Sequence, residues 1–466
     1  MKRIWFLWLC ACGSGAATGA PDAPPVAPDA PPIVGSIDDR LHAIPEITVG
    51  RPVTPVAQGY RGIALTFDQP EDHDAPAGPH FQQRVVLLHR DDTSPVVVYT
   101  TGYGLPSGPG GRAEPTQILA ANQIEIEHRF FVPSRPEPPD WSKLTIRQSA
   151  DDWHAIIGAF KRIYPQSRFI TTGGSKGGMT SIYHRRFYPA DVDGTVAYVA
   201  PISFGAPDDR YVAFVQQTGL PDCRQRLNAF QREVLLRRAA MLTRLGQNGL
   251  SYTILGPDVA LEHAALEFPF VFWQYDSPAA CSGIPDASAT DDQIYSFLDT
   301  GVPANGLDSF ADRDIQYFLP YYFQASVQLG YPKIDESNAA GLLNHPGTDV
   351  APTYTPGLNP VWDEAAAMND VAAWVKTQGN RLLLIYGEYD PWSAGAFDLG
   401  GATDSFKLIV AAGNHGSRIA LLGATDQATA TAALRRWAGL PPPAKPAEPV
   451  QVDARELPET PRMRPR

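Results

Sequence analysis

The chain has 466 residues, a hydrophobic content of 44% and a formal net charge of −12. This length and apolar content allow a large buried core and indicate a globular protein of one or more domains. The acidic balance argues against nucleic acid as a partner. It suits either a site that attracts cationic ligands or an acidic surface that keeps the protein solvated.

The first twelve residues have the pattern of an export signal. Lys2 and Arg3 precede an apolar run from Ile4 to Leu9, which is too short to span a membrane. The run ends in LCACG, which resembles a bacterial lipoprotein cleavage site and would leave Cys12 as a lipidated N-terminus. We therefore expect an exported protein, extracellular or in the cell envelope, whose membrane contact is a lipid anchor at Cys12. Ordinary secretion and an unprocessed N-terminus are the alternatives.

Two segments have compositions that cannot form a core. Residues 13–36 consist largely of Ala, Pro, Gly and Asp, and residues 441–466 are rich in proline and charge. Such segments bury too little apolar surface to offset the conformational entropy lost on ordering. We expect a disordered linker before the folded part and a disordered tail after it.

Between these segments, strand and helix patterns alternate. Short β-branched or aromatic runs predict strands, and apolar residues at three- and four-residue intervals predict helices. In chain order we expect an antiparallel strand pair at 63–67 and 83–89, strands at 95–101 and 123–131, a helix at 145–164, a strand at 168–172, a helix at 178–188, and strands at 194–200, 381–387 and 406–411. The alternation implies a mostly parallel sheet, with the almost wholly apolar strand 95–101 in its centre.

The alternation breaks between residues 202 and 362. A long helix is expected at 228–245, and aromatic clusters follow at 268–275 and 317–323. We interpret this segment as a helical cap over the active end of the sheet, and we expect the aromatic clusters mainly to form its core.

Two cysteines remain beyond the N-terminal segment, Cys223 and Cys281. In an exported protein such a pair meets an oxidising compartment, where two thiols tend to form a disulfide. We predict a Cys223–Cys281 disulfide. Two free buried thiols are the alternative, because the sequence does not show whether the Cα atoms approach closely enough.

The sharpest chemical signal is the pentapeptide GGSKG at 173–177, which has the form G-x-S-x-G between a predicted strand and a predicted helix. In such a turn Ser175 would be exposed at the carboxyl end of the sheet as a nucleophile. The glycines are needed because a Cβ would collide with adjacent strands. The backbone N–H of Lys176 would be one oxyanion donor, and Gly102 or Tyr103, in the loop after the central strand, would supply the second.

A serine nucleophile needs a histidine base that is oriented by a carboxylate. Asp390 follows strand 381–387, and His415 follows strand 406–411. Glu388 is the competing acid, and Asp390 is preferred because it lies deeper in its loop. The chain order of serine, acid and histidine predicts an α/β-hydrolase fold, with a mostly parallel central sheet formed by residues 37–201 and 363–440 and a helical cap inserted at 202–362.

No histidine has metal-ligand spacing, and the sequence contains no glycine-rich phosphate loop. We therefore expect neither a metal nor another cofactor.

Several motifs together resemble one family. They are FDQPEDH, FQQRV, EIEHRFF, TGGSKGGMTSIYHRRFYP, GEYDPW and GNHG, in this order across about residues 50–440. They resemble the secreted bacterial tripeptidyl and prolyl aminopeptidases, serine peptidases distantly related to lysosomal prolyl carboxypeptidase and dipeptidyl peptidase II. The resemblance implies Ser175, Asp390 and His415 as the triad, a cap that restricts access, and cleavage near a free peptide N-terminus, often beside proline. The lysosomal relatives differ at Lys176 and around the histidine, so their substrate preferences are not transferred.

An aminopeptidase must bind the substrate ammonium, and buried carboxylates do this by charge-assisted hydrogen bonds. Glu127, on the strand beside the central one, is the candidate, and Glu125 is the second choice. A structural ion pair of Glu127, with Arg129 or another base, is the alternative.

Three functions compete. The first is an exported serine aminopeptidase that acts on peptides with a free N-terminus. An exported esterase or lipase on the same scaffold and a surface binding protein with a degenerate site are the alternatives.

Overall fold

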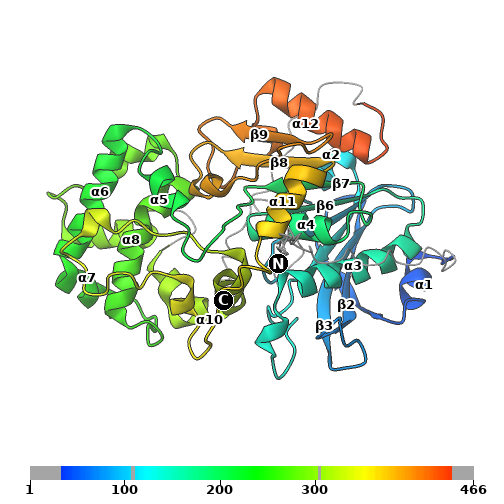
Figure 1. Ribbon diagram of the computed structural model, residues 1–466, viewed down its shortest axis with the longest axis horizontal. Coiled ribbons are helices and arrows are strands. Elements are labelled where there is room, and N and C mark those ends of the chain that lie inside the picture. Colours follow the sequence, from blue (N-terminus) through cyan, green and yellow to red (C-terminus); the bar gives the residue numbers. More distant parts are fainter. Residues whose placement is uncertain (1–32, 106–110, 303–305, 443–466) are drawn as a thin grey trace, which may run out of the picture.

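The computed structural model describes residues 33–105, 111–302 and 306–442. Within these residues, nine strands form one sheet in the order β1-β2-β3-β5-β4-β6-β7-β8-β9 (Figure 1). The strands are β1 (Ile47–Val53), β2 (Arg61–Pro70), β3 (His80–His89), β4 (Val96–Thr100), β5 (Asn122–Ile126), β6 (Phe169–Gly174), β7 (Gly194–Tyr198), β8 (Leu382–Gly387) and β9 (Phe406–Val410). From β1 to β5 the neighbours pair antiparallel, and from β5 to β9 they pair parallel. The apolar strand β4 lies in the middle, as predicted.

Helices cover both faces of the sheet. Side chains alternate along a strand, so Val96 and Val98 of β4 pack on one face, whereas Val97 packs on the other. The face of Val96 and Val98 is covered by α1 (Ile37–His42), α3 (Ile146–Ile163), α4 (Lys176–Phe187) and α11 (Asn369–Gln378). The opposite face is covered by α2 (Glu114–Leu119) and α12 (Ala424–Trp437). This three-layer arrangement is the predicted α/β-hydrolase fold.

The segment between β7 and β8 forms a helical insertion, which we define as residues 202–362. It contains α5 (Arg210–Val215), α6 (Pro221–Leu236), α7 (Arg238–Leu245), α8 (Pro257–Tyr275), α9 (Asp291–Thr300) and α10 (Asp312–Gln324). Figure 1 shows these helices, in green and yellow, beside the sheet rather than over one of its faces. A hydrophobic core of the insertion's own residues holds them together.

The predicted disulfide is present within this insertion. Cys223 on α6 and Cys281 are bonded, with 5.3 Å between their Cα atoms. The bond links α6 to the short 3₁₀ helix Pro278–Gly283, which lies 58 residues further along the chain.

Two predicted elements differ from the structure. The single helix expected at 228–245 is two helices, which meet at Arg237. Arg237 donates to the Ala287 and Ala289 carbonyls, whereas Arg238 pairs with Asp258 and Glu262 of α8, so the chain turns between the two arginines. The strand expected at 123–131 ends at Ile126, and Phe130, with a φ of 71°, lies in the turn that follows.

No helix in the described ranges is long and apolar enough to cross a bilayer. The expected lipid anchor at Cys12 lies outside the described residues, as do most of the expected linker and tail.

Candidate active site

Ser175 occupies the turn between β6 and α4. Its φ is 53° and its ψ is −125°, a conformation that residues other than glycine rarely adopt. The backbone N–H donates to the Tyr198 carbonyl at the end of β7 over 2.8 Å, which ties the strained turn to the next strand. Ser175 thus precedes the N-terminus of α4, where the helix dipole favours negative charge.

The glycines that flank Ser175 have no room for a side chain. A Cβ on Gly177 would lie 2.1 Å from the Thr100 carbonyl oxygen of β4. A Cβ on Gly173 would lie 2.4 Å from the Gly177 carbonyl carbon. Because β4 and α4 approach this closely, the turn requires glycine at both positions.

Asp390 and His415 follow the carboxyl ends of the adjacent strands β8 and β9. Both side chains are buried, and His415 Nδ1 lies 2.8 Å from Asp390 Oδ2. Asp390 Oδ1 also accepts from the Trp392 N–H over 3.2 Å, and the His415 N–H donates to the Gln274 carbonyl over 2.9 Å. A carboxylate on Nδ1 favours the tautomer in which Nε2 can accept a proton.

Glu388, the competing acid, is engaged elsewhere. Its Oε2 accepts from the backbone N–H of Ala412 over 2.7 Å at an exposed position. The structure therefore brings Asp390 to His415, while Glu388 holds the loop that follows β9.

In the loop after β4, two backbone N–H groups donate to threonine hydroxyls close by in the chain. The Gly102 N–H donates to Thr100 Oγ1 over 2.9 Å, and the Tyr103 N–H donates to Thr101 Oγ1 over 3.1 Å. Both N–H groups considered as the second oxyanion donor are thus engaged within the loop.

The Tyr103 side chain supplies a different donor. Its hydroxyl hydrogen-bonds with Ser175, and burial raises its pKa, so it remains protonated at neutral pH. Phe131, Phe318 and Tyr321 pack edge-on around the ring. The sequence predicted a backbone donor at this position. The sequence signal for a side-chain donor was the tyrosine itself, because Tyr103 lies in the loop that faces the nucleophile.

The Lys176 side chain is also part of this arrangement. It is 1% exposed, and its Nζ donates to the Gly102 carbonyl over 2.7 Å. Burial lowers its pKa well below the usual value. Lys176 therefore ties the loop after β4 to the start of α4, in addition to its predicted backbone role.

A cavity of about 400 Å³ is lined by Ser175 and His415 on one side and by the helical insertion on the other. Among its lining residues are four carboxylates, Glu267, Asp299, Asp308 and Asp314. The aromatic clusters contribute to both core and cavity: Phe272 and Trp273 are fully buried in the insertion, whereas Phe270, Tyr275, Phe318, Tyr321 and Tyr322 line the cavity. The expectation that these clusters mainly form core is therefore only partly correct.

Glu127 and Glu125, the expected ammonium ligands, are not among the described residues that line this cavity. Glu127 accepts from the Leu105 N–H over 2.8 Å and from Ser134 Oγ over 2.5 Å, and it pairs with Arg84. Glu125 accepts from Gln123 Nε2 over 2.7 Å. The structure thus places Glu127 in an ion pair with Arg84. A structural ion pair was the alternative to a role as ammonium ligand.

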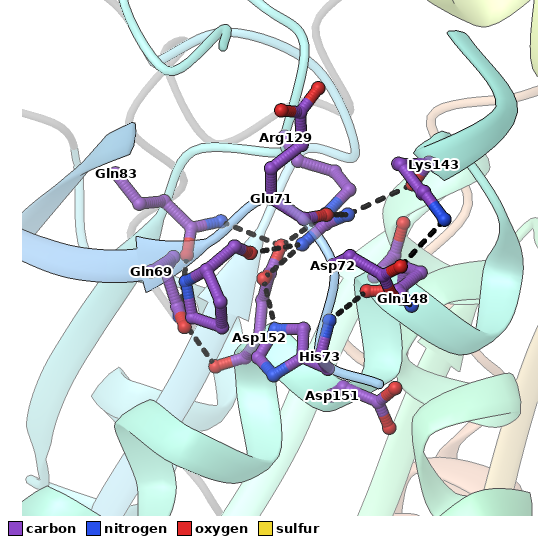
Figure 2. A network of polar contacts seen from close by, with 12 residues as sticks. Gln69, Glu71, Asp72, His73, Gln83, Arg129, Lys143, Gln148, Asp151 and Asp152 are labelled. Carbon is purple, nitrogen blue, oxygen red and sulfur yellow. Dashed lines mark hydrogen bonds and ion pairs between the residues drawn. The ribbon is translucent and has the colours of Figure 1, made fainter. Parts of the chain in front are cut away.

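Arg129 belongs to a separate buried network (Figure 2). Its Nε and Nη2 each lie 2.7 Å from an oxygen of Asp152 on α3. Nη1 donates to the Lys143 carbonyl over 2.8 Å and to the Glu71 carbonyl over 3.0 Å. The network anchors the segment after β5, from which Phe131 reaches Tyr103.

The fold and this arrangement of serine, histidine and carboxylate define a hydrolase of the α/β-hydrolase class. Within the described residues, no group of three or more His, Cys, Asp or Glu side chains is placed to hold a metal ion. The chain belongs to the peptidase S37 family, because the model described as PS-10 peptidase S37 matches residues 30–459. It is therefore a serine peptidase, as the motifs predicted.

Two relatives and one solved structure illustrate the similarity. The prolyl tri/tetrapeptidyl aminopeptidase of Streptomyces mobaraensis is 42% identical over 396 residues, which cover 83% of this chain and 82% of the relative. Prolyl carboxy peptidase like protein 5 of Caenorhabditis elegans is 28% identical over 142 residues, 26% of this chain and 28% of the relative. The proline iminopeptidase of Mycobacterium smegmatis has 12% identity and a TM-score of 0.34, covering 75% of this chain and 91% of the other.

Proposed function

We propose that this chain is a serine aminopeptidase that releases short N-terminal fragments from peptides, with Ser175, His415 and Asp390 as its catalytic triad. One observation carries the proposal. His415 is hydrogen-bonded to buried Asp390 and lines the same cavity as Ser175. The relative from Streptomyces mobaraensis, named for prolyl tri/tetrapeptidyl aminopeptidase activity, supports the substrate class.

In the proposed mechanism, His415 Nε2 takes the proton of Ser175 Oγ as the oxygen attacks the scissile carbonyl carbon. Asp390 holds Nδ1–H and stabilises the imidazolium that forms. The imidazolium then gives its proton to the departing amine nitrogen, the C–N bond breaks, and an ester forms on Ser175. Water, deprotonated by His415, attacks this ester and releases the N-terminal fragment as a carboxylic acid.

The oxyanion of the intermediate would be bound by the Lys176 backbone N–H and the Tyr103 hydroxyl. We choose these two donors because the Gly102 and Tyr103 N–H groups already donate to threonine hydroxyls of the same loop. The protonated phenol beside Ser175 is a donor from the same loop that could take this role.

The helical insertion would act as a cap that selects short peptides with a free N-terminus, often with proline beside the scissile bond. Its helices α8 and α10 supply half of the Phe, Tyr and Trp side chains that line the cavity, and this aromatic wall would limit access to Ser175. Export from the cytoplasm is part of the proposal, and the Cys223–Cys281 disulfide supports it, because structural disulfides persist in oxidising compartments.

The test compares a free peptide containing proline with its N-acetylated form and identifies the products by mass spectrometry. We expect short N-terminal fragments from the free peptide and almost no cleavage of the acetylated one. Equal rates would instead favour the esterase or lipase alternative, for which acyl esters are the matched substrates. A fluorophosphonate that labels the wild type and fails to label Ser175→Ala would identify the nucleophile. Full labelling of Ser175→Ala would contradict the assignment.

A further inference from the structure

Two acidic side chains of the helical insertion form a pair at the cavity wall. Glu267, on α8, lines the cavity, and the carboxyl of Asp349, a residue that is 4% exposed, lies beside it at the same tyrosine hydroxyl. Tyr354 donates to Asp349 Oδ1 over 2.8 Å and lies 3.4 Å from Glu267 Oε1. Burial raises the pKa of both carboxyls, and the charge of Asp349 raises that of Glu267 further, so the pair holds protons that an exposed pair would release.

Within the described residues, no lysine or arginine offsets the negative charge that the pair takes on when it ionises. The groups that act electrostatically on either carboxyl are each other, Tyr354 and Glu336, and none is a lysine or arginine. His263 hydrogen-bonds with Tyr354, but burial lowers its pKa to about 4, so it is neutral at physiological pH. An uncompensated buried carboxylate costs free energy, which a cationic ligand would recover.

Two other carboxylates of the cavity, Asp314 and Asp299, have partners of a different kind. Asp314 lies 3.2 Å from the guanidinium of Arg313, which also lines the cavity. Asp299 accepts from the Leu307 backbone N–H over 3.2 Å. Because no lysine or arginine acts on Glu267 among the described residues, it is better prepared than Asp314 to receive a cation. The face of Tyr322, which lines the cavity and stacks on Tyr354 with centroids 4.5 Å apart, adds a surface that favours an ammonium group.

We propose that the Glu267–Asp349 pair binds the ammonium group at the N-terminus of the substrate peptide. This inference deepens the proposed aminopeptidase function and rests on it. A peptide held at Glu267 and attacked at Ser175 spans the cavity, so the separation of the two residues sets the length of the released fragment. Glu267 and Asp349, from the insertion, would replace Glu127 as the ammonium site.

The main test is Glu267→Gln, which removes the charge and keeps the shape. We expect kcat/KM for the free peptide to fall about 100-fold or more, mostly through KM, because a charge-assisted buried contact is lost. Fluorophosphonate labelling of Ser175 should keep its wild-type rate, which shows that the fold and the nucleophile are intact. Asp349→Asn should have the same effect on KM.

Glu336→Gln is the matched control. It removes a charge near Asp349 but lies outside the cavity wall, so KM should stay near the wild-type value.

A second measurement uses the unmodified enzyme. Burial raises the pKa of Asp349 to about 7, so the pair loses protons as pH rises, and ammonium binding should strengthen. KM for the free peptide should therefore fall between about pH 5 and 7.5. The titratable groups that surround the pair are Tyr321, Tyr322, Tyr331, Tyr354, His263 and Glu336. Burial raises the pKa of each tyrosine and lowers that of His263, so the four tyrosines and His263 keep a constant charge in this range.

The outcomes separate the inference from the proposed function. A wild-type enzyme that cleaves free and acetylated peptides equally would refute the function before any variant is made. A wild type that requires a free N-terminus, with Glu267→Gln retaining wild-type KM, would overturn the ammonium site alone. If Glu267→Gln does not fold, Asp349→Asn and the pH dependence of the wild-type KM decide the question in the same way.

Discussion

His415 Nδ1 and Asp390 Oδ2 lie 2.8 Å apart, and neither residue is more than 2% exposed. In the proposed mechanism the carboxylate would both orient the imidazole and balance its positive charge during catalysis.

Replacing Asp390 by asparagine should therefore lower kcat by about four orders of magnitude, because the wrong tautomer would be favoured. Steady-state kinetics on a free peptide measure the effect. Glu388→Gln is the control and should act like the wild type, because the exposed Glu388 side chain accepts from the backbone N–H of Ala412 and not from His415. A larger loss in Glu388→Gln than in Asp390→Asn would reverse the choice of acid.

Tyr103→Phe should lower kcat by about 100-fold to 1,000-fold, with little change in KM, since it removes one oxyanion donor and keeps the ring packing. Tyr321→Phe removes a neighbouring phenol whose ring packs against Tyr103. That variant should alter KM more than kcat. A normal kcat in Tyr103→Phe would return the oxyanion role to a backbone N–H.

Gly177→Ala should give little folded protein, because the new Cβ would lie 2.1 Å from the Thr100 carbonyl oxygen. Soluble yield and thermal unfolding measure this. Gly283→Ala is the control: a Cβ there meets nothing within 4 Å, and its unfolding temperature should match that of the wild type. Normal stability in Gly177→Ala would show that β4 and α4 can separate.

The ion pair of Arg129 and Asp152 should be important for stability. Asp152→Asn would leave a fully buried guanidinium without its carboxylate, at a cost of about 3–5 kcal/mol in the free energy of unfolding. The control is Arg61→Met, which breaks an ion pair with Asp38 in which both partners are nearly half exposed. Its cost should be below about 1 kcal/mol. Denaturant unfolding of both variants provides the comparison.

Stability without substrate should depend on pH through the Glu267–Asp349 pair. Burial raises the pKa of Asp349 to about 7 and that of Glu267 well above its usual value. The folded state thus holds protons that the unfolded state releases above about pH 4, so this contribution to stability is lost as pH rises from there to about 7. We expect Asp349→Asn to show a smaller fall in unfolding temperature than the wild type over this range. Parallel curves would show that the pair does not titrate as described.

The sequence predicted the elements whose signal is local. The strand–turn–helix around Ser175 and the apolar centre of β4 follow from short patterns of glycine and apolar residues. Asp390 and His415 were found because each follows a strand of the same parallel sheet, whose carboxyl ends meet. β1 was missed because ITVGRPV contains Gly50 and Pro52, which weaken the pattern of a strand but are tolerated at a sheet edge.

Pairings across long distances in the sequence could not be predicted. Glu267 and Asp349 are 82 residues apart and belong to no motif, so only the packing of the insertion brings them together. Glu127 looked like a ligand because the sequence placed it on a strand beside the central one. Its partner, Arg84, comes from β3, and the sequence does not show that this arginine turns towards it.

The residues around the scissile bond and those around the rest of the peptide come from different parts of the chain. The turn at Ser175 admits no larger side chain at Gly173 or Gly177, whereas the opposite wall of the cavity belongs to an insertion with its own core. Evolution or an engineer can therefore change the length and sequence of the accepted peptide by altering α8 and α10, without disturbing the groups that break the bond. New specificities for this scaffold are best sought by randomising Phe270, Phe318 and Tyr322.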